Sequence, residues 1–513
     1  MVNFNLVIKK LNSLNKIIVA FYLLFLTTFA VAQQNSKIEL VNANTLEGGM
    51  FQGKKLKRFL GNVTFKQDNV FLYCDSAYYY DDRNAIDAFS NVHILQGDTL
   101  NLYGDLLKYD GNTKKAELFK NIRMIDKTMT LTTQQLNYDL STKVANYTTA
   151  GKIVDKDNVL TSNSGYYNSA KKEFFFKNNV VLTNPEYVMK SDTLKYNTQT
   201  KTVYFFGPTT IVTKEDYIYC ENGWYNTIKD VSQFNKNAFI RTKEQTLRGD
   251  SIYYNKKLGI GKAFKNIEIR DSIQKIIING DYAENNKKMA LSLVTGKAML
   301  TQIFETDSLF LHADTLRVLN DSIAANRVLF AFHHVKMFKP DFSAKCDSMV
   351  YVYKDSTIQL FKEPVVWSRE NQLTAKFVTI EIKNKEIHKL NLFNSAFIIS
   401  QEDSLKFNQV KGKKMEGFFS QSRLYKVYVE GNGQTIYYAR EKDSTYTGVN
   451  RADCSNILLF FKDNRVGKIT LINAPDANFY PINELAPAEL RLKGFDWKIK
   501  YQPKRKEDIF KWE

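Results

Sequence analysis

Acidic side chains recur along this chain at intervals that would let them act together. They stand about 30 residues apart at Asp75, Asp105, Asp192, Glu221, Asp250, Asp281, Asp314 and Asp347, with Gln134 and Asn163 in the same series. Carboxylates in register could bind a cation such as Ca²⁺ or, as a pair, carry out glycosidase-type chemistry. A ladder of like charges is costly, so the favoured interpretation is a solvated outer face or a local turn hydrogen bond. No carboxylate leaves the series to nominate a catalytic acid and base.

The other residue types that carry chemistry show no supporting pattern. The five histidines are His93, His312, His333, His334 and His388. Their spacing to cysteines and acids does not match a zinc site, and the adjacent His333 and His334 are expected on opposite faces of a strand. There is no Gly-rich phosphate loop, nucleophile elbow or paired-Cys motif. We therefore predict no catalytic residue, no metal site and no cofactor, in a chain that is not an enzyme.

One tetrapeptide, Arg248-Gly249-Asp250-Ser251, has the sequence of a cell-adhesion signal. The residue types of this tetrapeptide are explained by an internal repeat of the sequence instead. Asp250 belongs to the acidic series, and Gly249 belongs to a parallel series of small residues. Only Arg248 occupies a variable position. The sequence therefore does not favour an adhesive role for this tetrapeptide.

Three more columns repeat with the acidic one, at steps of about 30 residues. The small column contains Cys74, Gly104, Thr133, Ser162, Ser191, Cys220, Gly249, Gly280, Ala313, Cys346 and Ala375. The apolar column, two residues earlier, contains Leu72, Leu102, Leu131, Leu160, Met189, Ile218, Leu247, Ile278, Leu311, Ala344 and Leu373. The tyrosine column, five residues after the small one, contains Tyr79, Tyr109, Tyr138, Tyr167, Tyr196, Tyr225 and Tyr254. Asp or Asn follows the tyrosine in six of these seven units.

Each repeat has the pattern of two strands. In the second unit, Leu100, Leu102 and Gly104 alternate with polar residues, as in a strand with one buried face. Turn residues follow at 110–112, and a second strand is expected around residues 116–122. No unit can bury its apolar face alone, so neighbours must stack into one core. The sequence therefore predicts an all-β, elongated, repeat-built fold of about eleven units of roughly 29 residues.

The cysteines are predicted to be buried free thiols. Cys74, Cys220 and Cys346 share the small column but stand several units apart. Neighbouring strands are ~4.8 Å apart, whereas a disulfide needs Cα atoms within about 7 Å. Cys454 is expected to be alone.

The start of the chain is typical of export. Lys9, Lys10 and Lys16 precede an uncharged apolar run, residues 17–32, that ends in small residues. This is the pattern of a secretory signal peptide, with an uncleaved anchor as the alternative. The net charge is +18, of which the leader supplies three lysines. Such an excess suits acidic partners such as phosphorylated lipid headgroups or nucleic acid, or it is a solvated lysine-rich surface.

The repeat resembles a known family. Units reading N-V-x-apolar, then L-x-small-D-x-x-x-Y-[DN], as in residues 61–81 and 265–285, are similar to those of the OstA/LptA family of periplasmic lipopolysaccharide-transport proteins. The likeness covers roughly residues 38–400, and the chain resembles the longer OstA-like proteins of the Bacteroidetes type. The resemblance implies an open, twisted β-jellyroll whose apolar interior shelters lipid acyl chains, in proteins that stack end to end.

The resemblance makes part of the apolar column the candidate lipid-facing wall. These candidates are Leu72, Leu102, Leu131, Leu160, Met189, Ile218, Leu247, Ile278 and Leu311. An equal alternative is that these side chains fill a closed core. The expected organisation is a signal peptide (1–32), an OstA/LptA-like β-repeat domain (33–400), a C-terminal β-rich extension or cap (401–490) and a basic tail (491–513).

The function implied is a periplasmic, non-enzymatic carrier or bridge for lipopolysaccharide, with association with the outer membrane as a further expectation. Its expected partners are lipid A, other Lpt-type bridge, inner-membrane and outer-membrane translocon components, and further copies of itself end to end; nucleic acid is not expected. The alternatives are a structural or adhesive exported β-solenoid without lipid cargo, and a carbohydrate-active β-helix enzyme.

Overall fold

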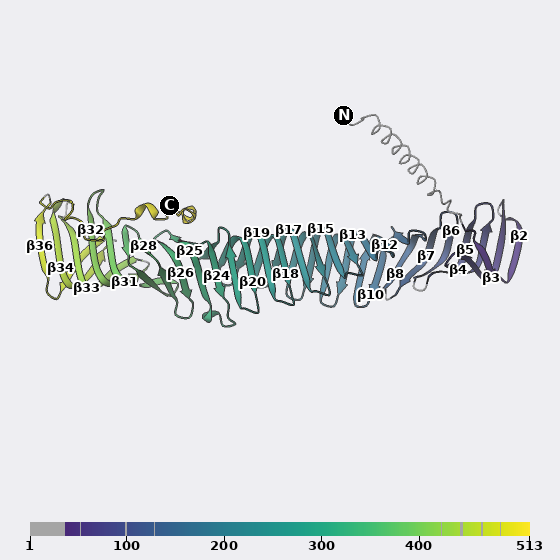
Figure 1. Cartoon of the computed structure of the whole chain (residues 1–513), viewed down its shortest axis with the longest axis horizontal. Coiled ribbons are helices and arrows are strands. Elements are labelled where there is room, and N and C mark those ends of the chain that lie inside the picture. The colour runs from purple at the N-terminus through teal and green to yellow at the C-terminus, as the bar shows by residue number, and fades with distance from the viewer. Residues whose placement is uncertain are drawn as a thin grey trace, which may run out of the picture. The chain divides into compact units, whose positions relative to one another are not determined.

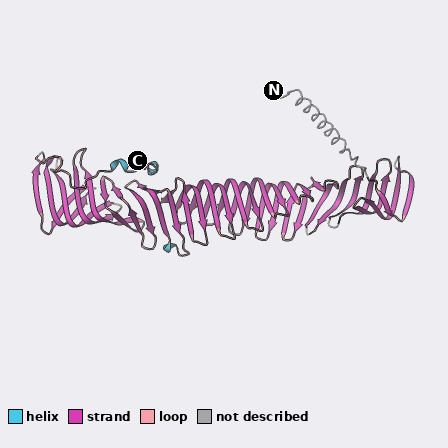
Figure 2. Ribbon diagram, viewed as in Figure 1, coloured by secondary structure: helices cyan, strands magenta, loops and turns pink. Residues whose placement is uncertain are grey.

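The described part of the chain is almost entirely β-structure. The computed structural model describes residues 36–51, 53–97, 100–127, 129–421, 423–441, 445–462, 465–482 and 484–512. They form 36 β-strands and three short 3-10 helices (Figures 1 and 2), which confirms the all-β prediction. The predicted signal peptide lies outside the described residues. No helix in the described part has the length and apolar character needed to cross a membrane.

The chain divides into two compact units, residues 1–176 (unit 1) and 177–513 (unit 2). Unit 1 contains β1 (Glu39–Asn42), β2 (Thr45–Phe51), β3 (Lys54–Gln67), β4 (Val70–Tyr80), β5 (Ala85–Gln96), β6 (Leu100–Asp110), β7 (Lys115–Asp126), β8 (Met129–Asp139), β9 (Val144–Tyr147), β10 (Gly151–Asp155), β11 (Asn158–Ser162) and β12 (Ser164–Asn168). The boundary falls within β13 (Glu173–Asn184).

Unit 2 contains the longer series of strands. They are β14 (Tyr187–Asn197), β15 (Thr202–Thr213), β16 (Tyr217–Asn226), β17 (Val231–Arg241), β18 (Gln245–Asn255), β19 (Ile260–Asp271), β20 (Ile276–Asn286), β21 (Leu291–Thr295), β22 (Met299–Ile303), β23 (Ser308–His312), β24 (Thr315–Leu319), β25 (Val328–Lys339), β26 (Phe342–Val352), β27 (Thr357–Phe361), β28 (Val365–Ser368), β29 (Asn371–Thr374), β30 (Phe377–Lys383), β31 (Glu386–Gln401), β32 (Phe407–Ser420), β33 (Arg423–Arg440), β34 (Tyr446–Lys462), β35 (Arg465–Ile472) and β36 (Asp476–Pro481). The 3-10 helices are η1 (Ala324–Asn326), η2 (Ile499–Tyr501) and η3 (Lys506–Phe510).

Within each unit the strands form an antiparallel meander in chain order (Figure 1). In unit 1, each strand from β4 to β8 pairs with the strand that follows it. In unit 2, the same holds from β14 to β20. Each predicted repeat is therefore an outgoing strand that carries the small residue and a returning strand, as β6 and β7 illustrate.

Every repeat bends in the middle of its strands. The pairing of β6 with β7 breaks between Tyr103 and Leu106. In β7 the bend contains two successive left-handed residues, Lys120 (φ 63°) and Asn121 (φ 49°). This conformation is unfavourable for most L-residues and is tolerated best by Gly and Asn. The bend, here called the corner, divides each strand between two layers. An outgoing strand runs from the first layer through its corner into the second layer, and a returning strand runs back from the second layer to the first.

The small column lines the inner side of the corners. A Cβ on Gly104 would lie 3.5 Å from the Leu118 side chain and 3.5 Å from the Lys120 carbonyl oxygen. On Gly280 a Cβ would lie only 2.5 Å from Val294 Cγ1. The space available at this column is thus limited to small residues, as the repeat predicts.

The acidic column lies on the outer side of the same corners. Asn91 Nδ2 donates to Asp75 Oδ2 at 2.8 Å, and Asn121 Nδ2 donates to Asp105 Oδ2 at 2.6 Å. Glu221 and Asp250 make the same bond to the left-handed Asn237 and Asn266 of their returning strands. The local hydrogen bond thus accounts for the acidic residue in these four repeats.

The expectation for the adjacent histidines is wrong. His333 (φ 60°) and His334 (φ 54°) are the two left-handed residues of the β25 corner, so they do not alternate across an extended strand. Ring nitrogen Nδ1 of His334 lies 2.8 Å from Asp314 Oδ2, and that of His333 lies 3.3 Å from Asp347 Oδ1. The pair thus joins the acidic residues of two successive repeats.

The Asp or Asn after each tyrosine begins a turn. Asp110 Oδ1 accepts from the backbone N–H groups of Asn112 (2.9 Å) and Thr113 (3.0 Å). Asn226 Oδ1 makes the equivalent bonds in unit 2, including one of 2.8 Å from Lys229 N–H. These side chains reverse the chain at the end of the second layer.

The cysteine prediction is confirmed. Cys74, Cys220, Cys346 and Cys454 are all free and buried. Burial raises the pKa of Cys74, Cys220 and Cys346 to about 12. These thiols are therefore packing residues of the corners rather than reactive groups.

Corners continue beyond residue 400, where the sequence columns fade. Pairing breaks between Phe393 and Ala396 in β31 and between Glu430 and Gly433 in β33. Gly433 pairs with Cys454, which places these residues at the corner position. Residues 401–481 therefore extend the same folded meander with longer strands.

The C-terminal segment, residues 484–512, runs back over the outer face of the first layer of unit 2. The Gln372 side chain donates to the Asp496 carbonyl and accepts from the Lys498 N–H, both at 2.7 Å. Gln409 likewise pairs with Leu490 O and Leu492 N, both at 2.9 Å. The segment thus binds the sheet through its backbone, like an added strand. Leu492 also joins an outer apolar cluster with Phe397, Ile399, Phe407, Ile436, Tyr438 and Val449.

Candidate functional site

The apolar column forms one continuous row inside the first layer. In unit 1, Leu72 is paired with Ile94, and Ile94 in turn with Leu102. In unit 2, Leu247 is paired with Ile269, which is paired with Ile278. Directly paired residues share a face of the sheet, so the row runs along the interior between the two layers.

The predicted lipid-facing residues differ in exposure. Six are buried, namely Leu72 (4 % exposed), Leu102 (0 %), Leu131 (1 %), Leu160 (7 %), Met189 (1 %) and Leu311 (3 %). Ile218, Leu247 and Ile278 are half-buried. The interior is thus more accessible around β16–β20 than in unit 1.

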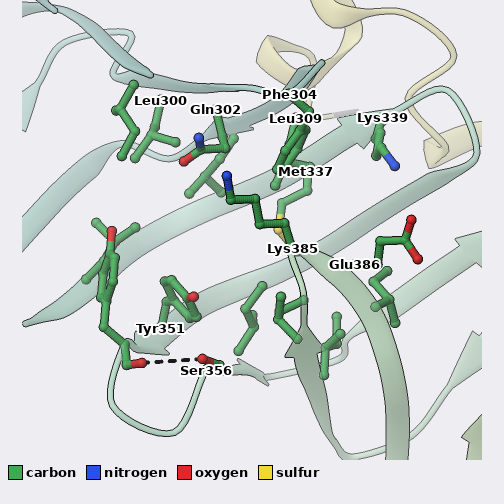
Figure 3. Close-up of a pocket in the computed structure, with 18 of the residues that line it drawn as sticks. Leu300, Gln302, Phe304, Leu309, Met337, Lys339, Tyr351, Ser356, Lys385 and Glu386 are labelled. Atoms are coloured by element: carbon green, nitrogen blue, oxygen red, sulfur yellow. Dashed lines mark hydrogen bonds between the residues drawn. The ribbon is translucent and has the colours of Figure 1, made fainter. Parts of the chain in front are cut away.

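A cavity of about 650 Å³ lies between the layers of unit 2 (Figure 3). Its first-layer wall includes Leu300, Leu311 and Met337, and its second-layer wall includes Met349 and Ile380. Alternation along the strands supplies these side chains: Met337 is paired with Ala344, and Met349 with Leu360. The cavity is therefore a section of the interior in which the two layers do not meet.

Charged groups lie at the rim of this cavity. Lys275 and Lys385 are exposed and stand at turns with left-handed φ values of 56° and 66°. In Figure 3 the Lys385 side chain projects among the lining residues. Lys339 Nζ lies 3.2 Å from Asp307 and 3.5 Å from Asp341. The rim thus combines an ion-paired lysine with two exposed lysines.

Polar groups within the cavity are mostly satisfied by the protein. Gln302 Nε2 donates to the Gln274 carbonyl oxygen at 3.0 Å. Burial raises the pKa of Tyr351 and of Tyr353, so both phenols stay neutral at physiological pH. The described residues contain no group of three or more His, Cys, Asp and Glu that could hold a metal ion. The arrangement is suited to binding an apolar chain with a negatively charged head.

Sequence reasoning located only part of this site. Of the nine predicted lipid-facing residues, only Leu311 lines the cavity. The residues that were missed come from returning strands and from the second layer, such as Met337, Met349 and Ile380. The sequence pattern that indicates these residues is the alternation of apolar and polar residues in β25, β26 and β30.

The paired layers, the corners and the apolar interior define a repeat-built antiparallel β-jellyroll. Residues 35–192 and 188–250 match the model of the family described as OstA-like protein. This match confirms the resemblance to OstA-like proteins inferred from the repeats, over residues 35–250.

Among solved structures, the chain is similar to LptH from Pseudomonas aeruginosa, described as the LptA-homologous periplasmic component of the lipopolysaccharide transport device. The similarity has 16 % sequence identity, covers 23 % of this chain and 82 % of LptH, and has a TM-score of 0.20. No curated protein matches the chain.

Proposed function

We propose that this protein binds lipopolysaccharide in the periplasm and carries it toward the outer membrane, with lipid A acyl chains held between the two layers of unit 2. The observation that most directly supports this proposal is the apolar cavity of about 650 Å³ within unit 2. Its size lies within the ~300–1,000 Å³ of typical ligand pockets. The OstA-like match over residues 35–250 supports the class of protein, whereas the site itself rests on the cavity.

Burial of acyl chains supplies the binding energy in this proposal. The lining side chains Met337, Met349 and Ile380 offer no charge. Each buried methylene contributes about 0.8 kcal/mol, so about ten of them would contribute about 8 kcal/mol before the cost of ordering the chain. Movement along the protein is then passive and non-enzymatic, and net transport needs energy from an inner-membrane partner.

The rim of the cavity carries positive charge that complements the phosphates of the lipid headgroup. Lys275 and Lys385 are exposed beside the cavity, where an ammonium group can pair with a phosphate of lipid A. The net charge of +18 favours the approach of an anionic lipid.

The proposed partners are other Lpt-type bridge, inner-membrane and outer-membrane translocon components. Self-association end to end is included, because β2 exposes Leu46 (57 %) and Met50 (69 %) near one end of the strand series. Exposed apolar residues on a terminal strand favour pairing with another chain.

A site-specific photo-crosslinker tests the binding site in cells that produce the full chain. Met349 lines the cavity, whereas its neighbour Val350 points to the opposite face. We expect a lipopolysaccharide adduct with the crosslinker at Met349 and none at Val350. An exported, folded protein that gives no adduct at Met349 would favour the alternative, a structural exported β-solenoid without lipid cargo.

A further inference from the structure

The two layers of unit 1 are joined by hydrogen bonds along the edge opposite the corners, here called the seam. At one rung, the Tyr109 hydroxyl of the second layer donates to Gln67 Oε1 at the end of the first layer. Gln67 Nε2 donates back to the Gly111 carbonyl oxygen at 2.8 Å and to Ser36 O at 2.6 Å. Gln67 therefore bonds the second layer through both ends of its amide.

The next repeat has the same arrangement. The Tyr138 hydroxyl donates to Gln96 Oε1, and Gln96 Nε2 donates to the Leu140 carbonyl oxygen at 2.9 Å. Tyr138 and Gln96 are only 2 % and 9 % exposed. The bonds recur with the same sequence separations as at Gln67, so they are a property of the repeat and not of one side chain.

The third rung replaces the amide by a carboxylate. The Tyr167 hydroxyl donates to Asp126, and Lys172 Nζ lies 3.2 Å from the same carboxylate. Asp126 is 6 % exposed. An ion pair of the same separation, Lys114 with Asp68 at 2.6 Å, lies outside the Gln67 rung. Three successive rungs thus close the seam with buried polar contacts.

The interior behind this seam is filled. Leu102, Leu107 and Leu118 are 0 % exposed. The cavity bordered by Gln67 and Tyr109 has a volume of only about 10 Å³, whereas the cavity in unit 2 has about 650 Å³. Behind these rungs, the described residues therefore leave no room for an acyl chain unless the seam opens.

In unit 2, Tyr225 of the tyrosine column and the nearby Tyr282 bond within their own layer. The Tyr225 hydroxyl donates to Asp230 in the adjacent turn at 2.9 Å, and the Tyr282 hydroxyl donates to Glu284. The tyrosine column ends at Tyr254, and the next repeat has Asn285, which accepts from Ser292 Oγ at 2.9 Å. An Asn side chain is too short to cross the seam as a tyrosine does.

Residues at the ends of the first-layer strands of unit 2 also form local hydrogen bonds. Thr213 accepts from the Asp216 N–H of its own turn at 2.8 Å, and Thr242 accepts from Gln245 N–H at 3.0 Å. Asp271 accepts from Gln274 N–H at 2.8 Å. Thr213, Thr242 and Asp271, which occupy the place of Gln67 and Gln96 in three repeats of unit 2, thus stabilise turns.

We infer that the lipid cargo is held by unit 2 alone, and that unit 1 is a closed section whose seam is fixed by Tyr109, Tyr138 and Tyr167. This inference rests on the proposed function. An acyl chain that entered unit 1 would leave the buried side chains of Gln67, Gln96 and Asp126 without hydrogen-bond partners. It would also displace close-packed side chains. The repeats of one protein therefore serve two purposes, support and cargo binding.

Thiol labelling tests the closure without any lipid. Leu131→Cys and Ile278→Cys place a thiol in the same apolar column of unit 1 and unit 2, and the native thiols are buried. We expect the thiol at position 278 to react with a maleimide at least roughly tenfold faster, because Ile278 is half-buried and Leu131 is 1 % exposed. Equal rates in the folded full chain would overturn the inference.

Phe substitutions test the assigned residues. Replacing Tyr109, Tyr138 and Tyr167 by Phe in the Leu131→Cys background should raise labelling at position 131 roughly tenfold, since buried hydrogen bonds are lost. Tyr225→Phe is the control, because its hydroxyl bonds within one layer. If the triple variant fails to fold, Tyr138→Phe alone in the Leu131→Cys background tests the same prediction. A folded Phe variant that labels no faster than its parent would overturn the role of these tyrosines.

Crosslinking to purified lipopolysaccharide separates this inference from the proposed function. With photo-crosslinkers at Leu131 and at Met349, which lines the cavity of unit 2, an adduct at Met349 only supports both. Adducts of equal yield at the two positions would overturn the confinement of cargo to unit 2 and leave the proposed function standing. No adduct at either position would overturn the proposed function, and the cargo part of the inference with it.

Discussion

The corner hydrogen bond explains the tetrapeptide at residues 248–251 at the scale of single residues. Asp250 accepts from Asn266 Nδ2 at 3.0 Å, and Gly249 is buried in the corner. The Arg248 guanidinium lies over the Phe239 ring, 5.5 Å from its centre. These residues are part of β18, so their types follow from the fold of one repeat.

Substitutions of Asn266 should separate the two contributions of a corner Asn. Asn266 has a φ of 49° and donates to Asp250. Asn266→Ala loses the hydrogen bond and places an alanine in the left-handed region, which costs about 1–2 kcal/mol. Asn266→Gly loses the bond but tolerates the conformation. We expect a clearly lower thermal unfolding midpoint for the Ala variant than for the Gly variant. Equal midpoints would mean that the backbone conformation contributes nothing.

At the scale of strands, the position of a glycine relative to the corner decides whether a side chain fits. A Cβ on Gly249 would lie 3.6 Å from the nearest backbone oxygen, that of Lys265. A Cβ on Gly223, in the second-layer half of β16, would lie 2.3 Å from the Gln233 carbonyl oxygen. Gly249 has room for a methyl group, and Gly223 does not.

Alanine at these two glycines should therefore give different results. Gly249→Ala is expected to change the free energy of unfolding by less than about 1 kcal/mol, since alanine occurs in this column. Gly223→Ala is expected to lower it by about 1–3 kcal/mol, because a backbone carbonyl must move. Chemical denaturation of both variants beside the wild type measures the difference. A Gly223→Ala variant as stable as Gly249→Ala would contradict this account of β16.

The sequence predicts the strands and corners well because they depend on residues close together in one repeat. The small residue at Gly104 and the Asn at 121 mark a corner by themselves. The state of the seam is harder to predict, because it depends on contacts such as Tyr109 with Gln67, which are 42 residues apart and belong to different repeats. The cavity was missed for a related reason: the steps of the columns lengthen after Gly280 and their identities fade.

At the scale of the whole molecule, the C-terminal segment changes the chemistry of the sheet that it covers. Lys336 on β25 is 3 % exposed, and its ammonium group donates to the Lys511 carbonyl oxygen. Burial, followed by the charges of Lys345 and Lys511, lowers the pKa of Lys336 to about 8 despite Asp508 nearby. The basic tail is thus docked on the protein, and one of the lysines beneath it has a pKa lowered to about 8.

This lysine should give the protein a measurable pH dependence. The pKa of Lys336 is about 8 in the folded chain against a reference of 10.5. Between these values the unfolded chain binds the proton that the folded chain has released, so the contribution of Lys336 to stability rises with pH. Lys336→Met removes this dependence. We expect the variant to be more stable than wild type near about pH 7.5, by up to about 2 kcal/mol, with a smaller difference near about pH 9.5. A difference that is independent of pH would contradict the assignment.

The meander has a consequence for how the protein reaches its folded state. Within each unit, strands pair with the next strand in the chain or with one two or three strands away, as β21 does with β24. Most contacts are therefore local and form quickly. A repeat can nucleate on the one before it, without waiting for distant segments. Only the last residues must find a site made much earlier, since Lys511 binds Lys336, 175 residues before it. Docking of the C-terminal segment is therefore expected to follow the folding of the strands that it covers.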